Sequence, residues 1–371
     1  MKQKIIAFCK KEVVLVVATV LAVASAFVVP PSAAYWGYID WHVLGVLLSL
    51  MIVMAGLQTN GLFDALGEAL LLRTKRVWQL VLVLVLLCFF LSMAITNDVA
   101  LITFVPFAVI ALEKSQKQNL LIPVVVLQTV AANLGSMLTP IGNPQNLYLY
   151  NLSGMGIGDF VLVMLPYTGL SLGLLLICIL FLKGKKDKVV IEDVTDVELN
   201  KTKILVYLIL FALAFLVVLK VLQFEIVLAI TLLVVFFMER KVLKDVDYCL
   251  LLTFISFFVF TGNMGNIPVI KNTLQQLVEG REVLVGVISS QAISNVPAAL
   301  LLSGFTSNYR ALLVGVNLGG LGTLIASMAS LISYKILANR YNDKKGKYFL
   351  WFTLTNLGFL LILFVASLIF E

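Results

Sequence analysis

Charged residues are scarce in this 371-residue sequence: Asp, Glu, Lys and Arg make up 13% of it, whereas hydrophobic residues make up 61%. The mean hydropathy is +1.05, which lies far above the range of soluble domains. No soluble domain is visible in the sequence. The composition predicts an all-α polytopic membrane protein with the lipid bilayer as its main partner.

Histidine and cysteine are also rare, with one His and four Cys. The cysteines show no short-range pairing pattern, and three of them lie in or beside apolar runs, which favours buried free thiols over disulfides or a metal site. The sequence has no acidic dyad for a divalent metal and no nucleotide-binding loop. An intramembrane enzyme therefore lacks support, and we expect no cofactor.

Long uncharged runs recur along the chain, the longest from Gln118 to Gly158. Many of the runs reach roughly 20 residues, the length of a helix that spans a bilayer. Two shorter stretches, 204–219 and 221–238, are apolar enough to cross with local thinning. We expect about nine full spans and two segments, 76–113 and 281–310, that enter the membrane and return to the same side.

The basic residues support this threading. With the N-terminus in the cytoplasm, 23 of the 27 Lys and Arg residues fall on the cytoplasmic side, where membrane proteins retain positive charge. The C-terminus, Glu371, is then outside. Topology explains the net charge of +7, so the charge gives no reason to invoke a nucleic-acid partner.

The two returning segments have similar centres, ITNDVA at 95–100 and ISNVPA at 293–298. The arms around Asn295 hold about a dozen residues each, or roughly 18 Å of helix, and neither can cross roughly 30 Å of hydrocarbon. We therefore predict a re-entrant hairpin at each site, with these residues at its tip. Two tilted spans would fit the charges equally well, and the leading arm of the first hairpin is long enough to span.

A second pair of stretches follows the tips: NLGSMLTPIGNPQNL from Asn133 and NLGGLGTLIASMASL from Asn317. Aligned without gaps, they share Asn, Leu, Gly, Thr, Ile and the final Leu. Two motifs recurring in one order predict an internal repeat. Five crossings separate the equivalent first helices, and this odd number makes the repeats inverted. We expect a first repeat at 1–182, a cytoplasmic loop and linking helix at 183–221, and a second repeat at 222–371.

The stretch 134–146 is unusual because it places prolines and glycines at the depth of the lipid tails. Irregular backbone is tolerated there only where protein or a water-filled cavity supplies its hydrogen bonds. Pro140 and Pro144 remove backbone donors, while Gly135 and Gly142 permit unusual dihedral angles. We expect a membrane helix broken into two halves, whose ends, amides and hydroxyls bind an anion or weak acid, with carbonyl oxygens nearby for a cation.

The tips TNDVALITFVP and SNVPAALLL, together with the two longer stretches, resemble the ion transporter superfamily. This superfamily includes arsenite permeases, citrate-type carboxylate permeases, NhaD-type sodium/proton antiporters and divalent anion/sodium symporters. The resemblance covers nearly the whole chain and implies two inverted repeats, each with a hairpin and an interrupted helix, often in a homodimer with elevator-like movement. It is specific for the superfamily but not for the substrate.

Several positions depart from the dicarboxylate symporters, which carry Ser-Asn-Thr at their tips. Asp98 and Val296 replace the final Thr, and the Asn-Asp tip is closer to that of arsenite permeases. The second loop has Leu324 and Ala326 where the first has Pro140 and Gly142, which weakens the case for a second equivalent ion site.

The resemblance and the motifs together identify candidate residues for binding the solute or the coupling ion. They are Thr96, Asn97, Asp98, Asn133, Gly135, Thr139, Pro140, Gly142, Asn143, Ser294, Asn295, Asn317, Gly319 and Thr323. A bound Na⁺ ion is expected near Asn97, Asp98, Gly142 and Asn295.

Asp98 is the only acid embedded at one of these motifs. A carboxylate at mid-membrane costs roughly 2.5 to 3.5 kcal/mol by insertion scales, so a functional role is the default. Our hypothesis is that Asp98 carries the coupling proton or helps to bind a cation. The alternative is that Asp98 caps a helix beginning near Val99, and Asn97 and Asn295 are also plausible N-caps.

The sequence favours a secondary active transporter of a small oxyanion, weak acid or carboxylate, coupled to H⁺ or Na⁺. A Na⁺/H⁺ antiporter without organic substrate is the main alternative, and a passive channel is another. The sequence does not choose among arsenite, carboxylates, sulfate-like anions or bare cations.

Overall fold

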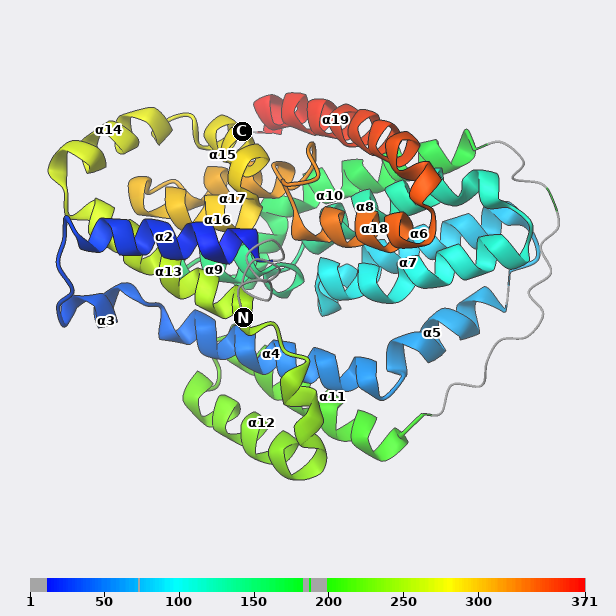
Figure 1. Ribbon diagram of the computed structural model, residues 1–371, viewed down its shortest axis with the longest axis horizontal. Coiled ribbons are helices and arrows are strands. Elements are labelled where there is room, and N and C mark those ends of the chain that lie inside the picture. Colours follow the sequence, from blue (N-terminus) through cyan, green and yellow to red (C-terminus); the bar gives the residue numbers. More distant parts are fainter. Residues whose placement is uncertain (1–11, 73, 183–186, 188–198, 371) are drawn as a thin grey trace.

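The computed structural model describes residues 12–72, 74–182, 187 and 199–370. The basic N-terminal residues with Cys9, the lysines at 183–188 and Glu371 lie outside the described residues. The described residues fold into a bundle of helices (Figure 1). Three of the four cysteines are described, and all three are free thiols; Cys88 is buried as the sequence predicts, whereas Cys178 and Cys249 are half-buried.

The first half of the chain contains eleven helical elements up to Leu180 among the described residues, counting the 3₁₀ turn η2 given below. Their bounds are α2 Val13–Ala26, α3 Ala34–Tyr38, α4 Trp41–Thr59, α5 Leu62–Leu71, α6 Val77–Ile95, α7 Asn97–Lys114, α8 Leu121–Ser136 with the 3₁₀ turn η1 Gln118–Leu120 before it, α9 Pro144–Ser153 and α10 Ile157–Leu180.

The second half of the chain holds the remaining helices among the described residues. Its elements are α11 Lys201–Val218, α12 Phe224–Glu239, η3 Arg240–Lys244, α13 Tyr248–Gly265, α14 Pro268–Val278, α15 Glu282–Ile293, α16 Asn295–Leu302, η4 Ser303–Phe305, α17 Tyr309–Leu318, α18 Met328–Arg340, η5 Asn342–Lys344 and α19 Lys345–Phe370. A further 3₁₀ turn, η2 Pro140–Gly142, belongs to the first half.

Seven helices of the described residues are long and apolar enough to cross a membrane. They are α4, α6, η1 with α8, α10, α11, α13 and α19. These helices and the composition make the chain an all-α polytopic membrane protein. The expected number of spans was nine. Three of the expected spans are too short in the structure: α2 and α12 have only 14 and 16 residues, and the stretch 311–334 is divided between α17 and α18. The 19-residue α6, expected as a hairpin arm, is long enough to span, which leaves seven among the described residues.

Polar side chains begin several of the membrane helices. Asp40 accepts a hydrogen bond from the Val43 amide at the start of α4 (3.0 Å), and Asp247 accepts one from the Leu250 amide at the start of α13 (3.0 Å). Such caps satisfy amides that have no partner in the first turn. The short α5 places Asp64 and Glu68 one turn apart on one face of the helix.

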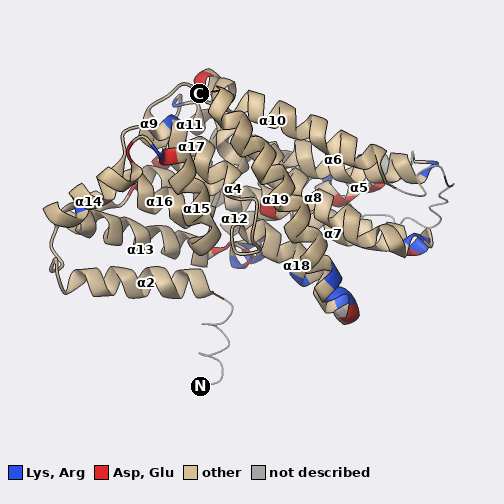
Figure 2. Cartoon of the chain, turned by 90° about the horizontal axis from the view of Figure 1, so that it is seen from above, with Lys and Arg blue, Asp and Glu red and all other residues tan. Residues whose placement is uncertain are grey.

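Charged groups gather at the ends of the helices, and the middle of the bundle is nearly free of them (Figure 2). Arg340 at the end of α18 forms an ion pair with Glu113 near the end of α7 (2.5 Å). Lys203 of α11 pairs with Glu239 of α12 (2.8 Å), and Asn60 after α4 donates to the same carboxylate (2.9 Å). These contacts join helices that are far apart in the sequence.

Candidate functional site

The first predicted tip is a sharp reversal between α6 and α7. Thr96 is the single residue between the two helices, with φ 73° and ψ 151°. A positive φ is rare for a residue other than glycine and costs of order 1–3 kcal/mol, so surrounding contacts must hold it. Asn97, 4% exposed, provides one of these contacts because its side-chain amide donates to Oδ1 of Asn133 (3.0 Å).

The second predicted tip has nearly the same backbone conformation. Ser294, the residue between α15 and α16, has φ 76° and ψ 154°. Its hydroxyl donates to the carbonyl of Ala326 (3.3 Å), and the backbone N–H of Asn295 donates to the same carbonyl (2.9 Å). Thr96 and Ser294 therefore occupy equivalent positions in the two segments.

The helix starts differ from the alternative assignments made from the sequence. Helices α7 and α16 begin at Asn97 and Asn295, so Thr96 and Ser294 hold the N-cap positions instead. Asp98 is within the first turn and does not cap a helix beginning at Val99. Its Oδ1 is buried and has no hydrogen-bond partner among the described residues.

The first interruption is shorter than predicted. Helix α8 ends at Ser136 and α9 begins at Pro144, so the break covers residues 137–143 within the expected 134–146. Thr139 donates from its hydroxyl to the carbonyl of Met93, three residues before the first tip. Pro140 begins the 3₁₀ turn. The interruption is thus attached directly to the α6–α7 segment.

Side chains donate hydrogen bonds to backbone carbonyls that this break leaves without a helical partner. Asn146 donates to the carbonyls of Ser136 (3.1 Å) and Thr139 (3.2 Å). Asn143 donates to the Ser136 hydroxyl (2.6 Å). A Cβ on Gly142 would lie 2.1 Å from the Ser136 carbonyl oxygen, so only glycine fits there. These hydrogen bonds stabilise the break.

The second interruption covers residues 319–327, between α17 and α18. Thr323 donates from its hydroxyl to the carbonyl of Gln291 (3.2 Å), which lies three residues before the second tip. The Gln291 side chain donates to the carbonyls of Gly319 (3.0 Å) and Leu321 (2.9 Å). Sequence analysis missed Gln291; its distance from the tip, equal to that of Met93, is the signal that could have identified it.

The two interrupted helices, α8–α9 and α17–α18, contact each other through buried asparagines. Asn317, 2% exposed, donates to Oδ1 of Asn146 (2.7 Å). Asn133, 3% exposed, accepts from the Ser327 hydroxyl (3.0 Å) and donates to the Ser330 hydroxyl (3.4 Å). Each predicted asparagine therefore reaches the helix that follows the other interruption. Sequence analysis did not single out Asn146, Ser327 or Ser330.

A cavity of about 230 Å³, here called the central cavity, lies beside the first tip. It is bordered by Thr96, Asp98 and Asn143 of the predicted residues, by apolar side chains of α4, and by Met328 of α18. Asp245 and Asp247 also line it, whereas no Lys or Arg is among its described lining residues. Asp247 is close enough to Asp98 to interact with it electrostatically. No sequence signal pointed to Asp247.

The other predicted residues are not among those that line this cavity. Gly135 and Gly319 lie where α8 and α17 approach Ser92 and Ser290, the residues four positions before each tip. Thr323 is exposed. Of the four residues expected near a Na⁺ ion, Asp98 alone lines the central cavity, and the Asn295 side chain accepts from the Val296 amide (3.0 Å).

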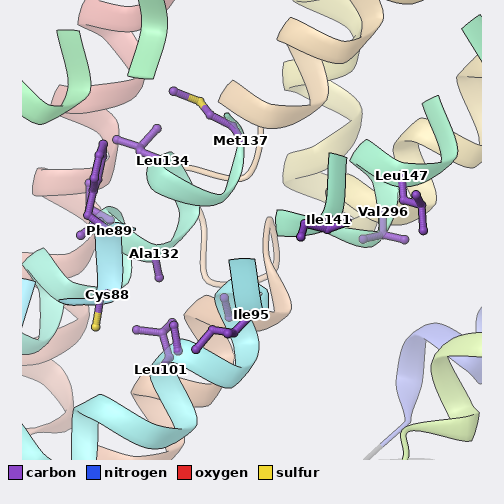
Figure 3. Close-up of a cluster of buried hydrophobic side chains, with 14 of the residues drawn as sticks. Cys88, Phe89, Ile95, Leu101, Ala132, Leu134, Met137, Ile141, Leu147 and Val296 are labelled. Carbon is purple, nitrogen blue, oxygen red and sulfur yellow. The ribbon is translucent and has the colours of Figure 1, made fainter. Parts of the chain in front are cut away.

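Apolar side chains fill the space around the polar network. Ile95 and Leu101 pack beside the first tip, and Phe89 lies against Leu134 of α8 (Figure 3). Val296 of the second tip lies beside Leu147 of α9 in the same view. This packing keeps the asparagines in a water-poor environment, where hydrogen bonds are strong and an unpaired polar group is costly.

The sequence is similar to known transporters. The profile of the citrate transporter family matches residues 5–309. An uncharacterized transporter of Methanocaldococcus jannaschii, MJ0456, is 33% identical over 84% of this chain and 85% of its own. The inner membrane protein YbiR of Escherichia coli is 33% identical over 86% of each chain. The silicon efflux transporter LSI3 of Oryza sativa is 31% identical over 39% of this chain and 30% of its own. The chain therefore belongs to the citrate transporter family and is a multi-pass membrane transporter, not an enzyme.

Proposed function

We propose that this protein is a secondary active transporter of a small anion or weak acid, coupled to H⁺ or Na⁺. One observation carries the proposal: the interrupted helix α8–α9 is hydrogen-bonded to the interrupted helix α17–α18 through Asn133 and Asn317. Irregular, polar backbone within a membrane bundle is costly unless it serves a site or pathway. Two interrupted helices that meet beside the central cavity would provide such a site.

The proposal includes two inverted repeats, 1–182 and 222–371, joined by 183–221, each with a re-entrant hairpin and an interrupted helix. Three matched features support it. The tips share one backbone conformation, the threonines of the two interruptions donate to carbonyls three residues before each tip, and Asn133 and Asn317 make reciprocal contacts. Reciprocal contacts are expected around a two-fold axis.

The lining of the central cavity limits the solute. The carboxylates of three aspartates line it, and no Lys or Arg is among its described lining residues. A low-dielectric environment strengthens repulsion between like charges. A weak acid that is neutral when bound, presenting hydroxyl groups to Asn143 and Thr96, fits better than a multiply charged anion. The acid would cross the membrane in its neutral form and release its proton to the solution after it leaves the site.

Asp98 is the proposed coupling residue. Its buried Oδ1 has no partner, and a buried carboxylate needs a proton, a cation or a hydrogen-bond donor. A proton, or a Na⁺ ion near Asp98, would supply that missing interaction. The solute and the coupling ion would then occupy the same cavity, which is the simplest arrangement for coupling.

Transport into vesicles tests the proposal. The purified protein is reconstituted into liposomes, and uptake of arsenite, silicic acid, citrate or succinate is measured with an imposed pH gradient, an imposed Na⁺ gradient, or neither. Saturable uptake that requires one gradient supports the proposal. Uptake that neither saturates nor depends on a second ion would indicate a channel instead.

A Na⁺/H⁺ antiporter is the second candidate, and the three carboxylates of the central cavity favour it. The same liposomes distinguish the two functions. An antiporter changes the internal pH when Na⁺ is added with no acid present, and none of the four solutes accelerates that change. The proposed orientation, with the N-terminus cytoplasmic and the C-terminus outside, and the proposed homodimer can be examined in the same preparation.

A further inference from the structure

A second cavity lies near the other end of α13. Its volume is about 470 Å³, and residues of α9, α13, α14 and α16 with η4 line it. Its lining includes the hydroxyls of Tyr148, Thr261 and Ser303, one cation, Lys271, and one carboxylate, Glu279. The central cavity is lined by Leu250 at the start of α13, whereas this second cavity is lined by Phe258 and Gly265 towards its end.

The two cavities therefore lie near opposite ends of a helix that is long enough to span the membrane. Helix α9 shows the same division: Pro144 and Leu147 line the central cavity, and Tyr148 and Leu152 line the second one. Leu147 and Tyr148 are consecutive residues. The two cavities are consequently separated by little more than the side chains at this level of α9 and α13.

Three aromatic rings occupy that level. The Tyr148 ring lies 6.4 Å from the Phe254 ring and 5.5 Å from the Phe258 ring, between centroids. Leu250, Phe254 and Phe258 follow one another at intervals of four residues, so they share one face of α13. Phe254 is fully buried and lines neither cavity. It stands between the residue that lines the central cavity and the residue that lines the second.

A single polar contact fixes Tyr148 in place. Its hydroxyl lies 2.8 Å from the Ser303 hydroxyl, which itself donates to the carbonyl of Leu300 (3.1 Å), so the Tyr148 hydroxyl is the donor. Ser303 directly follows α16, the helix that begins at the second tip. Movement of that tip would therefore be transmitted through α16 to Tyr148.

We propose that the solute pathway runs between α9 and α13, with the second cavity as an outer vestibule for a small hydroxylated acid and the Tyr148–Phe254–Phe258 cluster as the barrier between the vestibule and the central cavity. In the proposed orientation the vestibule faces outward. The inference rests on the proposed transport function, but its test does not require a known solute.

Cysteine accessibility tests the barrier in the full-length protein. The four native cysteines are replaced by alanine, a single cysteine is introduced as Leu250→Cys or Thr261→Cys, and a charged, membrane-impermeant thiol reagent is added to either side of vesicles. With the barrier intact, Leu250→Cys reacts from the central-cavity side and Thr261→Cys from the opposite side. Adding Phe254→Ala should make Leu250→Cys reactive from both sides.

Phe160→Ala is the matched control, because Phe160 is equally buried but packs against Tyr150 of α9 outside both cavities. It should leave labelling one-sided. Unchanged one-sided labelling in the Phe254→Ala background would overturn the proposal. Two-sided labelling in the Phe254→Ala background, together with no gradient-driven uptake by the unmodified protein, would support the barrier and reject the transport function. Failure of the barrier proposal and failure of the proposed function are therefore distinguishable.

Tyr148→Phe provides a milder test if Phe254→Ala does not fold. This substitution keeps the ring and removes only the hydrogen bond to Ser303, so the open population should rise about fivefold. Labelling of Leu250→Cys from the vestibule side should accelerate by the same factor. Tyr150→Phe, on the same helix, should not accelerate it. Equal labelling rates in Tyr148→Phe and Tyr150→Phe would overturn the proposal.

Discussion

Asn317 donates a hydrogen bond of 2.7 Å to Oδ1 of Asn146, and this bond joins the end of α17 to the start of α9. The two residues lie 171 positions apart. Because both are buried, neither can exchange its partner for bulk water. The bond holds the start of α9, whose Pro144 and Leu147 line the central cavity, and it is therefore a direct target for mutation.

We expect Asn317→Ala to reduce uptake while the protein still folds. Losing one buried hydrogen bond and leaving Asn146 without its donor costs about 1–3 kcal/mol. A cost of 1–2 kcal/mol changes an equilibrium constant by a factor of roughly 5–30. Initial uptake rates in liposomes measure the effect. Asn356→Ala is the control, since Asn356 is equally buried but bonds only to the Phe352 carbonyl within α19; equal losses in both variants would remove Asn317 from the site.

Asp98→Asn should abolish gradient-driven uptake and leave the fold intact. The substitution keeps the size of the side chain and removes the group that could bind a proton or cation, and it also removes a buried charge, so the melting temperature should not fall. Uptake under a pH or Na⁺ gradient and the melting temperature are measured together. Asp159→Asn, near the exposed start of α10, is the control. Undiminished coupled uptake in Asp98→Asn would reject the role.

Thr139 and Thr323 should depend on their hydroxyls in the same way. Each donates to a carbonyl three residues before a tip, so Thr139→Val and Thr323→Val should each loosen one tip by about 1 kcal/mol. The conservative Thr→Ser changes should retain the bond and the uptake rate. Thermal unfolding and uptake of the four variants provide the comparison. Loss in one half alone would argue that the halves are not functionally equivalent.

Gly135→Ala should destabilise the protein, because the added Cβ would lie 2.0 Å from the Phe89 carbonyl oxygen. Overpacking of this kind costs about 1–3 kcal/mol. Gly158→Ala, in α10 with no atom near its Cβ position, should be neutral or slightly stabilising. Melting temperatures in detergent distinguish the two. Equal stability of both variants would contradict the close approach of α8 to α6.

Local sequence patterns predicted the breaks and the tips, because proline, glycine and asparagine constrain the backbone at their own positions. They predicted the conformational equivalence of Thr96 and Ser294 less directly, through a three-residue match. The spacing of Gln291 from the second tip could have identified it, but the roles of Asn146 and Asp247 could not be predicted, since these residues lie beside segments distant in sequence. The same is true of the cluster around Tyr148, whose rings look like ordinary apolar packing until two cavities are placed on either side.

The account as a whole depends on one solute site built by both halves of the chain. Equilibrium binding of the transported solute to purified protein tests this most directly, using the unmodified chain, Asn133→Ala and Asn317→Ala. We predict one solute bound per chain, with both substitutions weakening that same site. Two independent sites per chain, each lost in only one of the variants, would contradict the account.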